Sequence, residues 1–417
     1  MHRSVWILAI LACLALAAAA RAQDRDENWK HCVDDDPDLS IGGCTALIQS
    51  GQETTTNLAI AFTNRCIAYH NKGDNEHAMQ DCDQAIRLKS DYASAFSERG
   101  VVAYDRGDYD QSIKDLNMAI QLKPDDAVAF NNRGNAYSSK GQHDLAIADY
   151  NQALQLKPDY ATAFNNRGDE YRIIGQYDKA ITDLDQAIKL RPDYALAFSN
   201  RGLVYFKQND DDHAIQDYSQ AIALKADDAD AYYGRGRAYA DKEQYDKAIA
   251  DFDQAIKLDP TDASALNSRC WYQAVIGQLQ PALADCTESL RLRPGDGPTL
   301  DSRGFVNLKM KNADAAIADY DAALSADPGL VYSLYGRGLA KHLKGDKAGG
   351  DADMAAATQA ESDIADKFAK LGVKDEVSGS YGTAIMIAAG IGVLAVIGFL
   401  GYYIGMRRSH PSPPASG

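Results

Sequence analysis

The sequence lacks most of the signals that would point to an enzyme. It contains no HExxH, P-loop or GxSxG motif, no Cys-x-x-Cys pair and no clustered Cys/His spacing of a zinc site. Basic residues are in the minority, with 43 Lys and Arg against 59 Asp and Glu and a net charge of −16. A nucleic-acid partner is not expected, because phosphate binding needs a basic face. No catalytic residue, cofactor or metal is expected either.

The first 22 residues consist of a short cationic start followed by an apolar run. His2 and Arg3 precede the run, and Ala20-Arg21-Ala22 ends it as a small-x-small sequence. This order is typical of a cleaved secretory signal peptide over 1–22, with an uncleaved membrane anchor as the alternative. None of the 17 asparagines begins an Asn-x-Ser/Thr glycosylation site, which favours a bacterial periplasm over a glycosylating compartment.

A second apolar run lies near the other end of the chain, at 383–406. It carries no charged side chain and would extend for about 36 Å as a helix, enough to cross a bilayer. A buried core helix is the weaker alternative, since only 407–417 follow it. That tail begins with two arginines and is expected to stay cytoplasmic. The sequence therefore predicts a single-pass protein of the bacterial inner membrane, with its repeats on the periplasmic face.

Between these ends the sequence repeats itself every 34 residues. Nine units open at positions 59, 93, 127, 161, 195, 229, 263, 297 and 331. Apolar and small residues recur at steps of three and four in two stretches of each unit, separated by a break such as Lys140-Gly141-Gln142. This period predicts two amphipathic helices per unit, which must stack on their neighbours to bury their apolar faces.

In its small-residue and aromatic positions, the repeat resembles the tetratricopeptide repeat (TPR) family over 59–364. The resemblance implies an all-α, right-handed superhelical solenoid whose first helices line a groove for protein or peptide segments. The last unit departs from the pattern at Lys341 and Gly350 and is interpreted as a degenerate terminal repeat. Residues 23–58 are interpreted as an N-terminal capping half-repeat, although Gly42-Gly43 leaves its helix boundary open, and 365–382 as a linker.

Six cysteines remain after the signal peptide, and four of them replace residues that are paired in the other units. Cys66 and Cys270 stand where other units have a helix-contact Gly, and Cys82 and Cys286 stand sixteen positions later, at a bulky position. In an exported protein this paired replacement predicts disulfides Cys66–Cys82 and Cys270–Cys286. Cys32 and Cys44 fall on the matching Gly and small-residue positions and are predicted to pair as well. Buried thiols are the alternative.

Each unit also carries an arginine, from Arg65 to Arg337, and an aspartate on its second helix, from Asp81 to Asp353. An anion-binding site is one interpretation of the arginines. Because the pair recurs in every unit, a repeated structural ion pair is the preferred prediction.

The groove residues are predicted from first-helix positions that avoid the core. In the middle units they are polar, and amides both donate and accept hydrogen bonds, so such a row suits an extended peptide backbone. It is similar to the asparagine ladder of O-GlcNAc transferase. Its predicted members are Asn131, Asn132, Asn135, Asn165, Asn166, Asp169 and Asn200. A solvated polar helix surface is the alternative.

Further along the chain the same stripe turns aromatic. Its predicted members are Tyr233, Arg237, Trp271, Phe305 and Tyr335, which are interpreted as anchors for a partner. Packing beneath a C-terminal cap is the alternative. The function predicted is a membrane-anchored scaffold for protein or peptide segments in the cell envelope. An adaptor subunit of a polysaccharide synthesis or export machine is the alternative within binding proteins, and an enzyme is the alternative of another class.

Overall fold

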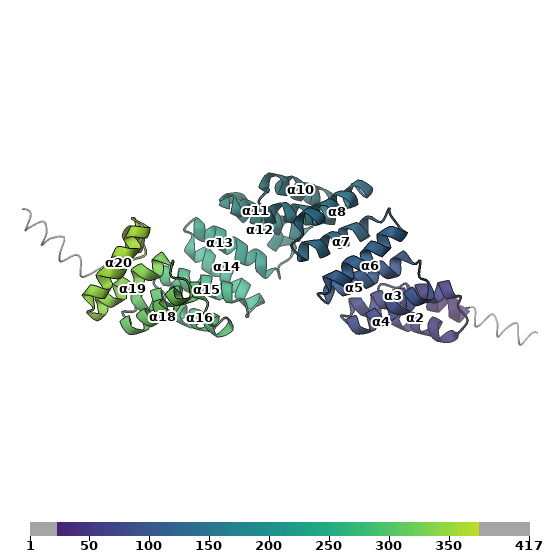
Figure 1. The fold of residues 1–417 in the computed structure, drawn as a ribbon, viewed down its shortest axis with the longest axis horizontal. Coiled ribbons are helices and arrows are strands. Elements are labelled where there is room, and N and C mark those ends of the chain that lie inside the picture. Colours follow the sequence, from purple (N-terminus) through teal and green to yellow (C-terminus); the bar gives the residue numbers. More distant parts are fainter. Residues whose placement is uncertain (1–22, 375–417) are drawn as a thin grey trace, which may run out of the picture. The chain divides into compact units, whose positions relative to one another are not determined.

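The computed structural model describes residues 23–374, and within them every regular element is a helix. The chain divides into two compact units, residues 1–226 and 227–417, each of which is a row of helix pairs (Figure 1). The predicted signal peptide, the transmembrane helix at 383–406 and the cytoplasmic tail lie outside the described residues. None of the helices within 23–374 combines the length and apolar character needed to cross a bilayer.

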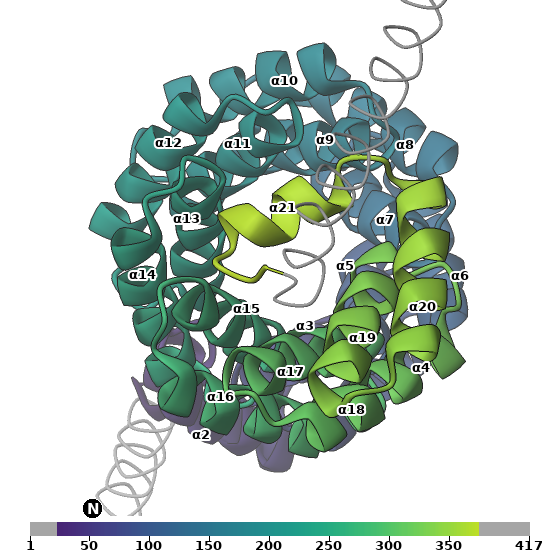
Figure 2. The ribbon, with the colours of Figure 1, turned by 90° about the vertical axis from the view of Figure 1, so that its left-hand side faces the viewer.

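The first unit begins with a helix over 23–32 and α2 (Pro37–Ser50), followed by five helix pairs. The first helices of the pairs are α3 (Thr55–Asn71), α5 (Ala93–Asp105), α7 (Ala127–Ser139), α9 (Ala161–Ile173) and α11 (Ala195–Lys207). The second helices are α4 (Asn75–Leu88), α6 (Tyr109–Leu122), α8 (His143–Leu156), α10 (Tyr177–Leu190) and α12 (Asp211–Leu224). In this unit α7, α9 and α11 lie on the inner side of the row, and α8, α10 and α12 on the outer side (Figure 2).

The second unit contains four helix pairs and one short additional helix. Its first helices are α13 (Ala229–Asp241), α15 (Ala263–Val275), α17 (Gly297–Lys309) and α19 (Val331–Lys344). Its second helices are α14 (Tyr245–Leu258), α16 (Leu279–Leu292), α18 (Ala313–Ala326) and α20 (Lys347–Ala360), and α21 spans Ile364–Lys370. The predicted 34-residue helix pairs are thus present in both units.

The turn between the two helices of a pair uses a left-handed residue at a fixed repeat position. Gly141 has φ 70°, in the region that glycine enters without steric cost. Glu243 stands at the same repeat position of the second unit and still adopts φ 57°. The repeat geometry therefore imposes this conformation even where the side chain disfavours it.

The two helices of a pair approach closely where the sequence has its glycine. A Cβ atom on Gly134 would lie 2.6 Å from Cε1 of Tyr150, and one on Gly168 would lie 2.9 Å from Cγ of Leu184. The glycine and the bulky residue sixteen positions later therefore face each other, as the sequence predicted. Only a residue without a side chain leaves room for the partner across the pair.

The cysteines form three disulfides in the predicted pairing. Cys66–Cys82 and Cys270–Cys286 join the two helices of one pair, with Cα–Cα distances of 5.6 and 5.5 Å. Cys32–Cys44 joins the helix over 23–32 to α2, with a Cα–Cα distance of 4.5 Å. All six cysteines are fully buried.

The N-terminal segment differs from the predicted half-repeat, because it contains two helices. Gly43 lies inside α2, where a Cβ atom would come within 2.6 Å of the backbone oxygen of Asn28. Gly43 therefore marks a close helix contact, and the Gly42-Gly43 sequence is not a helix boundary. The pair of helices extends the repeat architecture to residue 23.

The repeated arginines and aspartates form the predicted structural ion pairs. Arg167 donates from Nε and Nη2 to the two carboxylate oxygens of Asp183, at 2.6 and 2.7 Å. Its Nη1 donates to Asn151 Oδ1 of the preceding pair at 2.6 Å. The same two-oxygen geometry recurs from Arg65–Asp81 to Arg337–Asp353. The guanidinium groups therefore join the two helices of a pair.

The predicted linker at 365–382 begins with a helix, which corrects that interpretation. On α21, Ile364 is fully buried and Phe368 is 2% exposed. The Phe368 ring lies 4.9 Å from that of Tyr335 and 6.1 Å from that of Phe305, measured between centroids. Lys309 Nζ donates to the backbone oxygen of Leu371 at 3.1 Å and so holds the end of α21 against α17.

Candidate functional site

The predicted asparagine row does come together across α7, α9 and α11. Asn166 Nδ2 donates to Asn131 Oδ1 at 3.1 Å and to Asn135 Oδ1 at 3.0 Å, and Asn200 Nδ2 donates to Asn165 Oδ1 at 3.0 Å. The row therefore crosses three consecutive first helices of the first unit. Its members were expected to face a groove, however, and two of them do not.

Asn131 and Asn165 are buried, with 3% and 2% of their surface exposed. Each donates to the next residue in the chain, Asn132 and Asn166 respectively, at 3.3 and 3.2 Å. Buried amides need hydrogen-bond partners inside the protein, and here the partners are other asparagines of the same row. These two residues are thus structural links between helices, which corrects their prediction as groove residues.

The half-buried members keep part of their hydrogen-bonding capacity. Asn135 Oδ1 accepts from Tyr150 Oη at 2.8 Å as well as from Asn166. Among the described residues, the NH₂ groups of Asn132 and Asn135 donate to no other protein group. Asp169 is held by Arg172 Nε at 2.7 Å, so its charge is locally balanced. The row therefore offers mainly N–H donors, which suit the carbonyl oxygens of an extended peptide.

The predicted aromatic stripe of the second unit divides into a covered part and an open part. Phe305 and Tyr335 are 1% and 5% exposed, because Phe368 of α21 packs on both. Their prediction as exposed anchors is wrong, and packing beneath the C-terminal cap is their role. Tyr233 and Arg237 are half-buried, with the guanidinium 5.8 Å from the centre of the Tyr233 ring.

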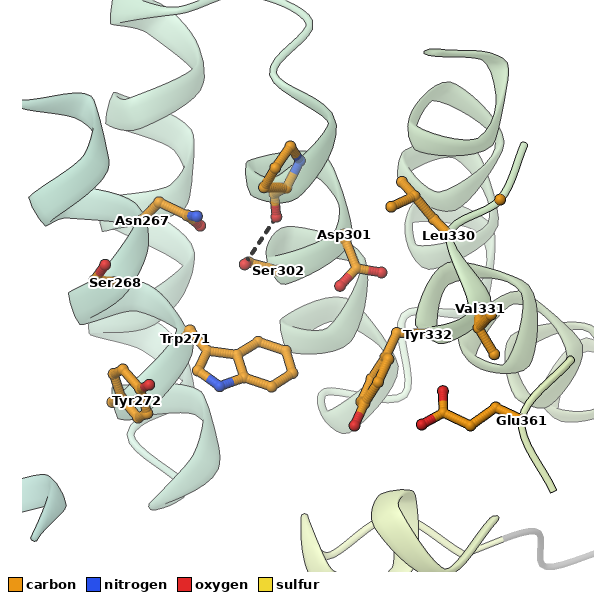
Figure 3. A pocket seen from close by; sticks show the side chains of 12 residues that line it. Asn267, Ser268, Trp271, Tyr272, Asp301, Ser302, Leu330, Val331, Tyr332 and Glu361 are labelled. Atoms are coloured by element: carbon orange, nitrogen blue, oxygen red, sulfur yellow. Dashed lines mark hydrogen bonds between the residues drawn. The ribbon is translucent and has the colours of Figure 1, made fainter. Parts of the chain in front are cut away.

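Trp271 remains partly exposed, at the wall of a pocket of about 600 Å³ between α15, α17 and α19 (Figure 3). Its lining residues are Asn267, Ser268, Trp271, Tyr272, Pro298, Asp301, Ser302, Gly329, Leu330, Val331, Tyr332 and Glu361. In Figure 3 the rings of Trp271 and Tyr332 lie next to each other with a gap between them, and the Asp301 carboxylate lies above Tyr332. Glu361 lies beside Tyr332, on the side away from Trp271.

Trp271 is the one residue lining this pocket that the sequence analysis predicted as a site residue. Asp301 occupies the same repeat position as Asn131 and Asn165, where the side chain turns inward. An acidic residue at a position where the other eight units have an amide, a hydroxyl side chain or tyrosine was a signal that the repeat alignment contained. Tyr332 and Glu361 gave no such signal, because their positions depend on how the last repeat and the segment after it fold.

The Asp301 carboxylate is held by a single hydroxyl. Ser333 Oγ on α19 donates to Asp301 Oδ1 at 2.5 Å. Burial raises the pKa of Asp301 to about 6, and the Ser333 hydrogen bond offsets only part of this effect. The pocket therefore contains a carboxyl group that changes charge near neutral pH.

We expect the second unit to lose stability as the pH rises through 6. In the folded unit the pKa of Asp301 is about 6, against 3.8 for an unperturbed aspartate. Between pH 3.8 and 6 the folded state therefore binds this proton more strongly than the unfolded state does, and the resulting stabilisation is lost as the pH rises through this range. Relative to Asp301→Asn, the wild-type free energy of unfolding should fall by at most about 3 kcal/mol between pH 4 and 7.5.

Urea unfolding followed by Trp271 fluorescence measures this difference, with Trp6 and Trp29 replaced by Phe. The Asn variant supplies the matched non-titrating control. A gap between the two proteins that stays constant across this pH range would contradict the expected ionisation of Asp301.

Among residues 23–374, no group of His, Cys, Asp and Glu has an arrangement that would hold a metal ion. The two surfaces differ in their polar groups, with amide donors in the first unit and an acidic, aromatic pocket in the second.

Comparison with known proteins identifies the repeat. A sequence model described as TPR repeat matches residues 102–141, 168–209 and 202–242. Two models described as tetratricopeptide repeat match residues 127–160 and 229–262, and residues 63–92. The search of curated proteins found no match to this sequence. The matched segments fall in both units, and those at 127–160 and 229–262 coincide with the helix pairs α7–α8 and α13–α14.

Several solved structures are similar to parts of this chain. The "APC/C hetero-tetramer Cut9-Hcn1" is 17% identical with a TM-score of 0.54, over 64% of this chain and 52% of that one, so the chain spans about half of that relative. "YrrB: a TPR protein with an unusual peptide-binding site" is 24% identical over 45% of this chain and 97% of that one, with a TM-score of 0.38. Pseudomonas aeruginosa pilF is 20% identical over 50% of this chain and 94% of that one, with a TM-score of 0.46. The matched segments of this chain are thus similar to the tetratricopeptide repeat, and the Cut9-Hcn1 structure has a similar fold.

Proposed function

We propose that this chain is a membrane-anchored scaffold that holds a protein or peptide segment on its first helices, outside the cytoplasm. The pocket of the second unit carries the proposal. It is an open recess of about 600 Å³ on first helices, and it is walled by aromatic side chains of the kind that dominate protein interfaces. Its lining also supplies the hydrogen-bonding groups of Asn267, Ser268 and Asp301.

The asparagine row supports the same function in the first unit. The NH₂ groups of Asn132 and Asn135 belong to half-buried side chains on α7, and the Asn166 hydrogen bonds fix Asn131 and Asn135 in place. Donors that are already oriented lose little freedom on binding. They would donate to the carbonyl oxygens of an extended segment with little sequence preference.

The membrane anchor rests on the sequence of 383–406 and on the apolar run at 1–22. An anchored scaffold of this orientation would present residues 23–382 to the periplasm, where the three disulfides are compatible with the redox conditions.

We therefore expect protease added to intact spheroplasts to digest the repeats while sparing an epitope tag placed after Gly417. The tag should be lost only after detergent opens the membrane. Immunoblots against the tag and against the repeats measure both ends of the same molecules. Protection of the repeats in intact spheroplasts would reverse the assigned orientation.

Site-specific photocrosslinking tests the binding function in the full-length protein in its own membrane. A photoreactive amino acid at Ser268, on the pocket wall, is expected to capture a discrete protein partner. The matched control places the same group at Gln254, an exposed position on α14. Equal products from the two positions, or none from Ser268, would count against the pocket as a binding site.

A further inference from the structure

The pocket of the second unit has an unusual charge balance. Two of its lining residues are acidic, Asp301 and Glu361, and none is basic. Glu361 already forms an ion pair with Lys367 of α21. Asp301 differs, since within residues 23–374 its carboxylate has Ser333 as a hydrogen-bond donor but no basic side chain at ion-pair distance.

This separates Asp301, whose side chain is half-buried, from the buried aspartates of the same unit. Asp251, Asp285 and Asp319 of the same unit are each paired with the arginine of their own repeat. A buried carboxylate without a cation is costly when it is ionised, and proteins rarely retain one without a reason. Here the carboxylate faces an open pocket, so a cation from outside can reach it.

The walls of the pocket suit the same kind of ligand. Trp271 and Tyr332 both line the pocket, with their rings next to each other in Figure 3, and aromatic rings attract cations and pack well on the methylene stems of long basic side chains. Packing fixes both rings. Trp271 lies against Phe305 at 4.9 Å between centroids, and Tyr332 against Phe368 at 5.7 Å.

We propose that this pocket receives one lysine or arginine side chain of the bound protein segment, with the cation at Asp301 and the stem between Trp271 and Tyr332. The inference rests on the proposed function, because it names the side chain that the scaffold selects. The occupant is a basic segment of a partner protein. Charge complementarity supports it, since the pocket is acidic and the chain as a whole carries a net charge of −16.

The proposal makes binding depend on pH in a defined direction. The cation requires ionised Asp301, whose pKa in the unbound pocket is raised to about 6 by burial, so binding should strengthen as the pH rises from 5 to 7.5. The other titratable groups around the pocket are Tyr272, Tyr320, Tyr332, Glu361 and Lys367. Burial raises the pKa of each of the three tyrosines from its ordinary value of 10, so they stay neutral over this range.

Defined peptides test the pocket. The probes are fluorescent ten-residue Ala/Ser peptides with one central Lys, Arg, norleucine or citrulline, titrated against the full chain in detergent by fluorescence polarisation. Norleucine and citrulline keep the length of lysine and arginine but carry no charge. We expect the Lys and Arg peptides to bind at least about tenfold more tightly than their neutral counterparts at pH 7.5, and this preference should shrink at pH 5.

The variants separate the pocket from general electrostatics. Asp301→Asn should abolish the preference for the charged peptides, and Trp271→Ala should weaken binding of the Lys peptide by about tenfold. Asp366→Asn removes the same charge from an exposed position on α21 and should leave binding unchanged. The thermal midpoint of each variant checks that the second unit remains folded.

The outcomes distinguish this inference from the proposed function. If Ser268 captures a partner but peptide binding is equal for Lys and norleucine, or is unaffected by Asp301→Asn, the scaffold stands and the basic-side-chain inference is wrong. If Ser268 captures nothing and no peptide binds, the binding function itself is contradicted. If Ser268 captures a second copy of this chain, the occupant is a neighbouring copy and not a partner protein.

Discussion

Replacing Cys66 and Cys82 together by serine is expected to lower the stability of the α3–α4 pair by about 5 kcal/mol. The disulfide closes a loop with a sequence separation of 16, and a cross-link of this size contributes about 3 kcal/mol. The rest is the cost of placing two hydroxyl groups where both cysteines are fully buried, about 1 kcal/mol each.

The repeat itself provides the matched control. The double change Cys66→Gly and Cys82→Leu recreates the contact of Gly168 with Leu184, so it removes the cross-link but restores an apolar fit. We expect this variant to lose only about 3 kcal/mol. Native-state hydrogen exchange of the α3 and α4 amides in the full chain measures both losses locally.

Two results would contradict this account. Equal stability of the wild type and the Gly/Leu variant would mean that the cross-link contributes nothing. A Gly/Leu variant no better than the Ser pair would mean that the positions do not oppose each other as Gly168 and Leu184 do.

The repeat features of the fold could be predicted from the sequence because the same pattern recurs in register through the nine units. A single glycine such as Gly134 says little, but a glycine in phase with a bulky residue sixteen positions later, in unit after unit, specifies a helix contact. The same register predicted the disulfides and the arginine–aspartate pairs. These contacts lie inside one unit or between adjacent units, so a local pattern determines them.

The features that the sequence did not predict are those that occur once. Helix α21 has only Ile364 and Phe368 as buried residues, and their spacing of four matters only if an apolar surface is there to receive them. That surface is made by Phe305 and Tyr335, which were interpreted as exposed anchors for that reason. The pocket likewise needs Asp301, Tyr332 and Glu361 from three segments, and no periodic pattern joins them.

The asparagine row lies between these two cases. Its register was predicted, and the hydrogen bonds across α7, α9 and α11 follow it. The sequence could not show that Asn131 and Asn165 turn inward, because an amide is compatible with both a solvent-facing and a buried position. Burial of these two side chains therefore separates the structural half of the row from Asn132, Asn135 and Asn200, which are half-buried.

Replacing Arg167 by methionine is expected to destabilise the α9–α10 pair by about 3–5 kcal/mol, because it leaves a buried carboxylate without its cation. Asp183 is 4% exposed and receives two guanidinium hydrogen bonds, and both are lost in this variant. The exposed pair Arg291–Glu288 is the control. Arg291→Met should leave the stability almost unchanged, since water replaces the lost contact.

The double variant Arg167→Met with Asp183→Leu decides what the ion pair contributes. Removing both charges leaves no unpaired group, so most of the lost stability should return, to within about 1 kcal/mol of the wild type. Hydrogen exchange of the α9 and α10 amides follows all three proteins. A single variant as mild as Arg291→Met would show that the pair is not structural, and the arginines would then have to be reconsidered as an anion-binding row. A double variant as unstable as the single one would instead show that the hydrogen bond from Arg167 to Asn151, which joins adjacent repeats, supplies the stability.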